Sequence, residues 1–171
     1  MIKFVARFLL HRIGITIVNQ YINEQLKIMS AKKVSKIAVL TSGGDSPGMN
    51  AAIRAVVRTS IYHGLQVFGV ARGYNGMIDD DIFEMYSKSV GNIIQRGGTI
   101  LKTARSAQFF ETEGRKTAYE NLNKRGIDGI VVIGGDGSFK GAQKFSHEFD
   151  IPCIGIPGTI DKDIAGSDFT I

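Results

Sequence analysis

Residues 130–140 read Ile-Val-Val-Ile-Gly-Gly-Asp-Gly-Ser-Phe-Lys, and this stretch decides the fold. The four apolar residues at 130–133 are typical of a buried parallel strand. The glycines that follow allow a tight turn and the close approach of a ligand. Ser138 is expected to cap the next helix, whose N–H groups would attract phosphate, and Asp136 is placed to hold a cation such as Mg²⁺ beside it. Taken alone, the stretch fits equally well an ordinary strand-to-helix turn in which Asp136 accepts only local N–H groups.

Length, charge and cysteine content limit the class of protein. The chain has 171 residues, enough for one domain with a real core. Its net charge is +5, and most of the excess lies in residues 1–28, so the charge is weak evidence for a nucleic-acid partner. No zinc-finger spacing, RNA-binding signature or arginine-rich helix occurs, so we expect no nucleic-acid partner. The one cysteine, Cys153, cannot form an internal disulfide, and as a small buried apolar residue it fits a reducing cytoplasm.

Residues 1–35 are predicted to be an N-terminal extension outside the fold. Apolar residues are frequent there, but basic residues interrupt them, and the uncharged run at 13–23 is too short to span a bilayer. A basic amphipathic helix lying on a membrane is one alternative. Residues 29–33, Met-Ser-Ala-Lys-Lys, are typical of a natural start, so we favour an upstream extension over residues 1–28 and expect no membrane partner.

A second strand, loop and helix begin at residue 36. Residues 36–41 are predicted to form a strand, and residues 42–50, Ser-Gly-Gly-Asp-Ser-Pro-Gly-Met-Asn, a glycine-rich loop. Pro47 suits the first turn of the following helix, with Asp45 or Ser46 as its cap. This is a phosphate-binding geometry, although its spacing is not that of a dinucleotide motif or a P-loop. A loop shaped only for packing is the alternative.

Two arginines stand out on that helix. Arg54 and Arg58 are four residues apart and lie on a different face from the apolar stripe. A solvated face is the default interpretation of such a pair. An anion site at a contact between subunits is the more specific interpretation.

The rest of the chain alternates between strand and helix patterns. We predict a strand at 65–71, a turn at 72–77, helices at 89–95, 112–125 and 138–147, and a buried strand at 153–156. Arg105 is placed to cross the strand ends and bind phosphates through its planar guanidinium, although a plain surface arginine fits the local sequence as well. Asp161 and Asp163 follow the last strand and would face the same side of an extended segment, which suggests acid–base or cation chemistry. A turn rich in Asp is the alternative there.

This alternation predicts an α/β protein with a doubly wound, Rossmann-like parallel sheet and helices on both faces, in a three-layer αβα architecture. Ligands of such folds bind outside the carboxyl ends of the strands. Four motifs are predicted at those ends, namely 42–50, 96–106, 134–138 and 157–163. Their agreement is stronger than any single match.

Together the four segments resemble the ATP-dependent 6-phosphofructokinases of the bacterial type. They are Leu-Thr-Ser-Gly-Gly-Asp-Ser-Pro-Gly-Met-Asn-Ala-Ala-Ile-Arg, Arg-Gly-Gly-Thr-Ile-Leu-Lys-Thr-Ala-Arg, Ile-Gly-Gly-Asp-Gly-Ser and Pro-Gly-Thr-Ile-Asp, in the family's order. The resemblance implies that residues 36–171 form the ATP-binding α/β domain of such an enzyme, truncated at its C-terminus. It further implies phosphoryl transfer from ATP-Mg²⁺ to the 1-hydroxyl of fructose 6-phosphate, a cytoplasmic step of glycolysis, and a homotetramer for the full-length form.

The resemblance also implies roles for individual positions. It assigns ATP binding to Gly44, Arg105, Ser106, Gly135, Asp136, Gly137 and Ser138, with Asp136 as the Mg²⁺ ligand. It assigns the sugar side to Thr159, Ile160 and Asp161. Asp161 would be the base that accepts the hydroxyl proton, assisted by Arg105, Thr159 and Asp163. It assigns a regulatory ADP-type site between subunits to Arg54, Val57 and Arg58.

Four departures from the family pattern matter. Lys162 stands where Asn is usual, Ser106 replaces a cysteine common in relatives, and Asn92 stands where an acidic residue often joins the effector site. The fourth departure is length, because the family continues for nearly as many residues again and supplies much of the sugar-phosphate site there. We therefore expect the 171 residues alone not to turn over fructose 6-phosphate.

Three alternatives remain beside this resemblance. Pyrophosphate-dependent relatives tend to carry Asp at position 137 and Lys at position 158, and because both are glycine here, ATP is favoured. Lipid and NAD kinases share the Gly-Gly-Asp-Gly turn, but the other three motifs disfavour them. A nucleotide-binding fragment without catalysis is the third alternative.

Overall fold

A computed structural model describes residues 34–159, 164 and 166–171. The predictions for residues 1–33 and for Ile160, Asp161, Lys162 and Asp163 lie outside the described residues. Val34–Ile171 form one compact unit. Within this unit, Val34 packs against the apolar core and Ser35 donates its backbone N–H and hydroxyl to the Asp128 carboxylate.

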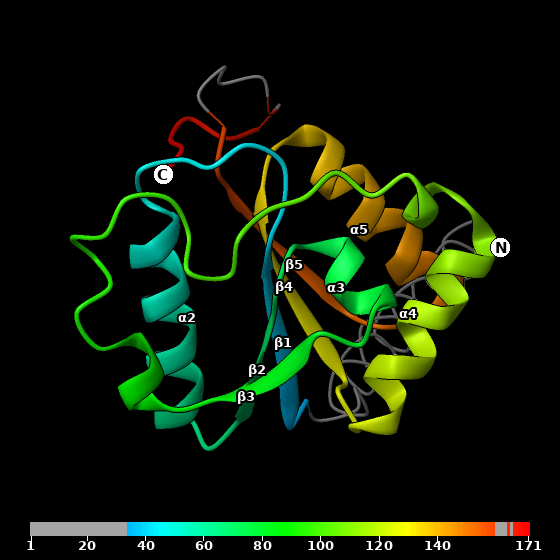
Figure 1. The fold of residues 1–171 in the computed structure, drawn as a ribbon, viewed down its shortest axis with the longest axis horizontal. Helices are drawn as coiled ribbons and strands as arrows, with labels where there is room; N and C mark the ends of the chain where they lie inside the picture. The colour runs from blue at the N-terminus through cyan, green and yellow to red at the C-terminus, as the bar shows by residue number, and fades with distance from the viewer. Residues whose placement is uncertain (1–33, 160–163, 165) are drawn as a thin grey trace, which may run out of the picture. The chain divides into compact units, whose positions relative to one another are not determined.

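Five strands form one sheet in the order β3-β2-β1-β4-β5 (Figure 1). The strands are β1 Lys36–Thr41, β2 Gln66–Val70, β3 Ile82–Met85, β4 Gly129–Gly134 and β5 Cys153–Pro157. Four of them are parallel, but β3 runs antiparallel to β2, so the predicted all-parallel sheet is corrected at this edge. The connection over residues 71–81 is shorter than a parallel crossover requires, so β3 returns beside β2 in the opposite direction.

Helices cover both faces of the sheet, which confirms the three-layer architecture (Figure 1). The helices are α2 Met49–Tyr62, α3 Tyr74–Ile78, α4 Thr112–Lys124 and α5 Asp136–Phe149, with 3₁₀ turns η1 Ser87–Val90 and η2 Gln108–Phe110. Alternate residues of each central strand face opposite layers. In β1, Ile37 and Val39 pack with α2, whereas Ala38 and Leu40 pack with α3, α4 and α5. The central strands are apolar throughout because both of their faces are buried.

Three local predictions are wrong. No α-helix forms at 89–95, since η1 ends at Val90 and the chain then turns through Gly91 and Asn92, which has a positive φ of 54°. The segment predicted as a turn at 72–77 contains the start of α3. The last strand is not buried, because β5 stands at the end of the sheet order and Ile154 is 65% exposed.

Both helices that follow glycine loops begin without the predicted side-chain caps. The N-cap of α2 is Gly48 rather than Asp45 or Ser46. The N-cap of α5 is Gly135, and Ser138 lies inside its first turn with its side chain buried. No side chain caps α5, so the N–H groups of its first turn are available to an anion, except that of Ser138, which donates to the Gly135 carbonyl at 3.0 Å.

None of the helices within the described residues has the length and apolar character that a membrane span needs.

Candidate functional site

The site lies where the direction of strand order reverses. From the central strand β1 the chain proceeds to β2 on one side, and later to β4 on the other. The loops after β1 and β4 therefore diverge and leave a crevice outside the carboxyl ends of these strands, the usual ligand position in open α/β sheets. The sequence pattern correctly predicts this edge.

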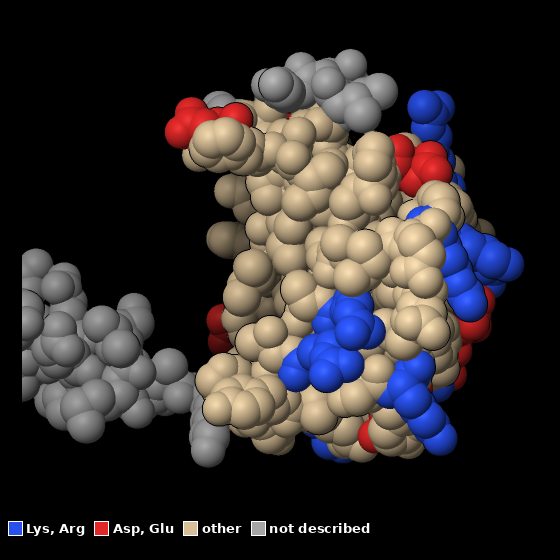
Figure 2. Space-filling view, turned by 90° about the vertical axis from the view of Figure 1, so that its left-hand side faces the viewer, with Lys and Arg blue, Asp and Glu red and all other residues tan. Residues whose placement is uncertain are grey.

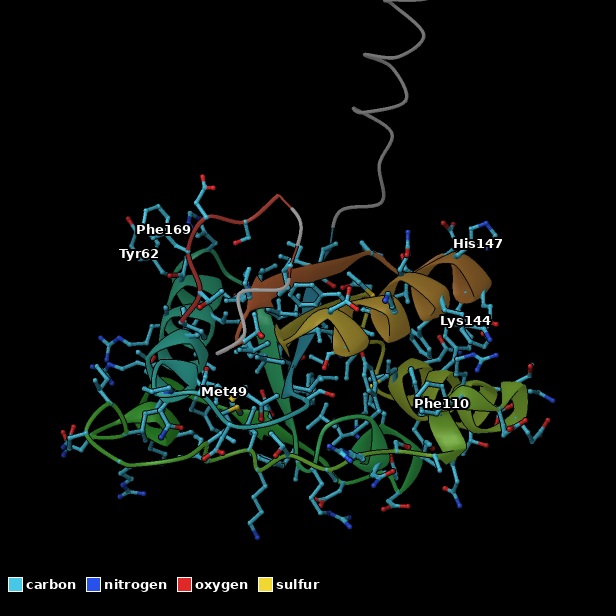
Figure 3. All side chains as sticks on the ribbon, turned by 90° about the horizontal axis from the view of Figure 1, so that it is seen from above. Met49, Tyr62, Phe110, Lys144, His147 and Phe169 are labelled. Atoms are coloured by element: carbon cyan, nitrogen blue, oxygen red, sulfur yellow. The ribbon has the colours of Figure 1, made fainter. Side chains whose placement is uncertain are left out.

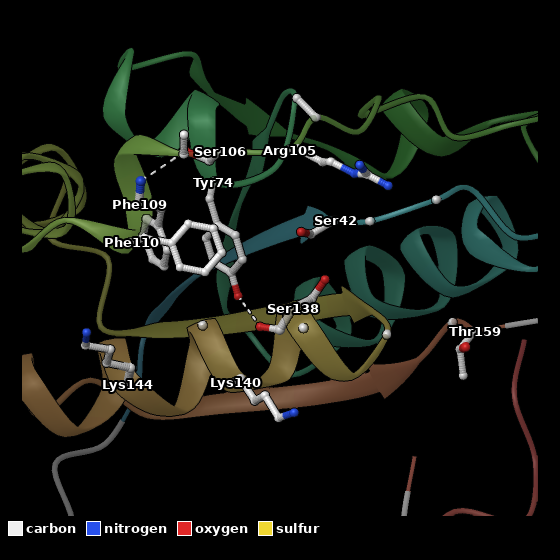
Figure 4. A pocket seen from close by; sticks show the side chains of 18 of the residues that line it. Ser42, Tyr74, Arg105, Ser106, Phe109, Phe110, Ser138, Lys140, Lys144 and Thr159 are labelled. Atoms are coloured by element: carbon white, nitrogen blue, oxygen red, sulfur yellow. Dashed lines mark hydrogen bonds between the residues drawn. The ribbon is translucent and has the colours of Figure 1, made fainter. Parts of the chain in front are cut away.

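A cavity of about 810 Å³ occupies this crevice (Figure 4). Among its lining residues are the predicted Gly44, Arg105, Ser106, Gly135, Gly137, Ser138 and Thr159. Seen from above the carboxyl edge, Met49 lies on the α2 side, whereas Phe110 and Lys144 lie on the side of α4 and α5 (Figure 3). The structure thus brings together predicted positions from all four segments.

Glycine is needed in these loops for two different reasons. At Gly134 an added Cβ would stand 2.5 Å from the carbonyl oxygen of Ser42, so a side chain would push the ends of β1 and β4 apart. At Gly44 and Gly137 nothing lies within 4 Å of that position. There the missing side chain leaves open space that a ligand can fill.

The segment at 96–106 lies across the carboxyl ends of β1 and β2. No strand lies directly before it, and just after β2 the Arg72 N–H donates to the Leu101 carbonyl at 2.7 Å. The Thr41 hydroxyl donates to the Lys102 carbonyl at 2.8 Å, and the buried Asn50 amide donates to the Arg96 carbonyl at 3.0 Å and accepts from the Ile100 N–H at 2.9 Å. These three bonds hold the segment across the carboxyl edge.

Arg105 and Ser106 follow directly and face the cavity. The Asn75 amide donates to the Arg105 carbonyl at 3.2 Å, and within the described residues the Arg105 guanidinium makes no ion pair. It extends toward the glycine loops (Figure 4). Ser106 is buried and its hydroxyl accepts the Phe109 N–H at 3.3 Å, so it fixes the turn that follows. A planar, charged guanidinium on a backbone segment that hydrogen bonds hold in place is suited to binding phosphate.

An aromatic wall closes the other end of the cavity, and the sequence pattern did not predict it. Tyr74 and Phe109 stack with ring centroids 4.0 Å apart, and Phe110 lies beside them (Figure 4). The Tyr74 hydroxyl donates to the Ser138 carbonyl at 2.5 Å, and burial raises the pKa of Tyr74 well above its ordinary value of 10. Tyr74 therefore stays neutral and joins α3 to the first turn of α5. The sequence feature that could have indicated this wall is Tyr74, an aromatic residue in a glycine-containing turn after a strand.

Arg115 was also missed, because its place in α4 is that of a surface-helix residue. Its side chain is 1% exposed and lines the cavity wall. It binds both oxygens of Glu148 on α5, at 2.5 and 2.9 Å, and the carbonyls of Phe109 and Phe110. It thereby ties the aromatic wall to α5.

Asp136, the predicted metal ligand, is not among the residues that line the cavity. It begins α5, and its carboxylate forms an ion pair with Lys140 at 2.6 Å while remaining 44% exposed. The described residues contain no cluster of three or more His, Cys, Asp or Glu side chains that could hold a metal. Mg²⁺ often takes only one or two carboxylates and completes its shell with phosphate and water. One exposed carboxylate beside a phosphate-sized cavity fits that donor set.

The three residues assigned to an effector site lie on α2, away from the cavity. Arg54 is partly buried and donates to the Val90 carbonyl, Arg58 is exposed, and Val57 is fully buried in the core. An effector could therefore meet Val57 only through its backbone. The face turned toward the viewer in Figure 2 carries groups of Lys and Arg side chains among uncharged residues.

The fold and the position of the cavity define a Rossmann-like α/β protein with its ligand site at the strand-order switch point. The family model described as "Phosphofructokinase" matches residues 36–171. The chain belongs to the phosphofructokinase family.

Curated relatives agree with this assignment. The chain is 61% identical over 138 residues to "ATP-dependent 6-phosphofructokinase 2" of Bacteroides thetaiotaomicron, a match that covers 81% of this chain and 42% of that protein. It is 64% identical over 139 residues to "ATP-dependent 6-phosphofructokinase" of Staphylococcus epidermidis, covering 81% and 43%. The chain therefore spans less than half the length of these relatives.

Solved structures show the same fold. Phosphofructokinase from Saccharomyces cerevisiae superposes with a TM-score of 0.78 at 43% identity, covering 80% of this chain and 22% of that one. Pyrophosphate-dependent phosphofructokinase from Marinobacter aquaeolei superposes with a TM-score of 0.69 at 20% identity, covering 79% and 36%. At that lower identity the likeness concerns the fold alone.

Proposed function

We propose that this chain binds ATP-Mg²⁺ as the nucleotide-binding half of an ATP-dependent 6-phosphofructokinase, whose complete form phosphorylates fructose 6-phosphate. One observation carries the proposal: seven positions predicted from four separate segments line a single cavity of about 810 Å³ at the switch point. The cavity has an aromatic end suited to a base and a glycine-rich end suited to phosphates.

ATP is favoured over pyrophosphate as the donor. Gly137 has open space at its Cβ position, and Gly158 lines the same cavity. An aspartate at the first position or a lysine at the second, as in pyrophosphate-dependent relatives, would fill or charge that space. The ATP-dependent relatives are 59–64% identical to this chain, whereas the pyrophosphate-dependent neighbours are 16–20% identical.

Phosphoryl transfer mainly requires that the reacting groups are aligned and that the charge on the phosphates is neutralised. Different residues of this chain would meet these two requirements. Arg105 and the uncapped start of α5 would bind phosphate oxygens, while the braced segment at 96–106 keeps the arginine in place. Asp136 would hold the metal ion, which neutralises phosphate charge when bound. Thr159, with Ile160, would face the sugar, and Asp161, assisted by Asp163, would accept the proton of the attacking hydroxyl.

Titration calorimetry with ATP-Mg²⁺ and a coupled turnover assay test this proposal on the purified chain. We expect saturable ATP binding that weakens when Mg²⁺ is chelated, and little or no turnover. Absence of ATP binding would overturn the proposal. In a longer chain with activity, Asp161→Asn should lower kcat by about 10²–10⁴, the usual contribution of a general base.

A nucleotide-binding protein without catalysis is the second candidate. It is supported by the lining of the cavity, which consists largely of the positions predicted to bind nucleotide. The test is a turnover assay in which the C-terminal half of a relative is added as a separate chain. Binding of ATP without turnover in this assay would favour the non-catalytic candidate over the nucleotide-binding half of an enzyme.

The proposed enzyme implies further partners. A complete form would work in the cytoplasm, where glycolysis takes place, and would assemble as a homotetramer. An ADP-type effector would then bind near Arg54 and Arg58 at a contact between subunits. Sedimentation of a complete form with and without ADP would test the assembly and its dependence on effector.

A further inference from the structure

One polar group at the site has no partner in the structure. Ser46 is 3% exposed, and its hydroxyl is the only buried side-chain N or O atom among the described residues that makes no hydrogen bond. Buried hydroxyls nearly always have a partner, so an unpaired one requires an explanation. The hydroxyl does not cap α2, whose N-cap is Gly48, although the backbone carbonyl of Ser46 accepts the Met49 N–H.

Among the described residues, no group forms a hydrogen bond with this hydroxyl. The Cβ position of Gly158 lies 3.4 Å from both the Ser46 hydroxyl oxygen and the Met49 methyl group, so one neighbour of the hydroxyl is apolar. A molecule that enters the site can supply the missing partner.

Ser46 belongs to the glycine-rich end of the cavity that it lines. Its neighbour Gly158 directly precedes Thr159, and Thr159 and the Arg105 guanidinium lie at the end opposite Phe110 and Lys144 (Figure 4). A nucleotide stacked on the aromatic wall would extend its phosphate chain toward this end. The phosphate closest to Ser46 would then be the terminal one.

We propose that Ser46 is a nucleotide-binding residue whose hydroxyl donates a hydrogen bond to the terminal phosphate of bound ATP, and that it makes the site prefer triphosphates over monophosphates. A serine hydroxyl reorients by rotation between staggered rotamers, and it can donate one bond. A phosphate oxygen is a charged acceptor, which gives a stronger bond than a neutral one. The inference rests on the proposed function, because it needs the phosphates in this cavity.

The experiment compares the wild-type chain with Ser46→Ala, using calorimetry with ATP-Mg²⁺ and with AMP, and thermal unfolding without ligand. We expect Ser46→Ala to weaken ATP binding about three- to tenfold, to leave AMP binding unchanged, and to leave the melting temperature unchanged or raised. Ser60→Ala, at a partly exposed position in the last turn of α2 and outside the cavity lining, is the matched control and should change neither affinity. Ser46→Cys, which keeps the volume but donates weakly, should repeat the selective loss if the alanine variant folds poorly.

The outcomes separate this inference from the proposed function. If the wild-type chain binds ATP and Ser46→Ala binds it equally well, the inference alone is overturned. Equal losses for ATP and AMP, or a lower melting temperature with unchanged affinity, would show that the hydroxyl stabilises the loop instead and would also overturn it. If the wild-type chain binds no ATP, both fail together.

Discussion

Replacing Arg115 should destabilise the fold more than any change to a surface ion pair. Its side chain is 1% exposed, and five hydrogen bonds satisfy it. Two of these go to Glu148 on α5, two to the carbonyls of Phe109 and Phe110, and one to the Thr112 hydroxyl at the start of α4. Arg115 therefore joins two helices and the turn between Ser106 and α4.

The magnitude follows from what each partner loses in Arg115→Met. Methionine fills similar volume, so little cavity forms. Glu148 is 28% exposed and can turn toward water, so only part of the free energy of its ion pair with Arg115 is lost. The buried Phe109 carbonyl loses a charged donor, at about 1–3 kcal/mol, whereas the Phe110 carbonyl is only partly buried and loses less. With the partial loss at Glu148, we expect a total of about 3–5 kcal/mol, the range found when one partner of a buried pair is removed.

Urea unfolding followed by far-UV circular dichroism measures this loss. Arg125→Met is the matched control, because Arg125 ends the same helix and pairs with Asp80, whose side chain is 42% exposed. Exposed pairs contribute about 0–1 kcal/mol, so this control should lose at most that amount. Equal losses in the two variants would refute the reasoning, since they would show that burial of the Arg115 network adds nothing.

Further predictions concern four other residues. The hydrogen bond from Arg115 holds the pKa of Glu148 below its ordinary value of 4.5. The stabilisation that ionised Glu148 gives the fold is therefore complete above pH 4.5 and is lost as the pH falls through the lowered pKa. The free energy of unfolding of the wild-type chain should fall more steeply in acid than that of Glu148→Gln, and equal acid profiles would contradict this. Tyr74→Phe removes the hydrogen bond to α5 and should cost about 0.5–1.5 kcal/mol in thermal unfolding; an unchanged melting temperature would argue against it. Asn50→Ala removes both bonds that brace residues 96–100 and should speed proteolysis there, whereas unaltered cleavage would mean that other contacts suffice. Asp136→Ala should raise the Mg²⁺ concentration needed for ATP binding, and an identical Mg²⁺ titration would remove this residue from the metal site.

The central part of the fold was predictable because its signals are local. Both faces of β1 and β4 are buried, so the strands appear in the sequence as uninterrupted apolar runs before glycines. The edge strands carry a weaker signal. β3 has only four residues, of which Ile82 and Met85 are buried, and no strand was predicted there. β5 was predicted as a strand from its apolar residues, but its largely uncovered position at the sheet edge was not.

The site was predictable only where glycine or charge marks a loop end. Gly44, Gly135 and Gly137 reach the cavity as predicted, because a backbone that admits phosphate needs glycine there. The aromatic wall and Arg115 depend on contacts between distant segments. Arg115 pairs with a residue 33 positions later, and no spacing within α4 distinguishes it from a surface arginine.

The failed cap predictions themselves indicate where function lies. Ser46 and Ser138 are ordinary capping residues, and a serine cap would stabilise each helix by about 1 kcal/mol. Neither serine caps its helix, although both line the cavity. A cap on α5 would compete for the N–H groups that the proposed phosphate site would use, so its absence would lower the stability of the free chain and strengthen phosphate binding by a comparable amount. Local rules of stability are expected to fail at such positions when a ligand, rather than the chain, completes the hydrogen bonds.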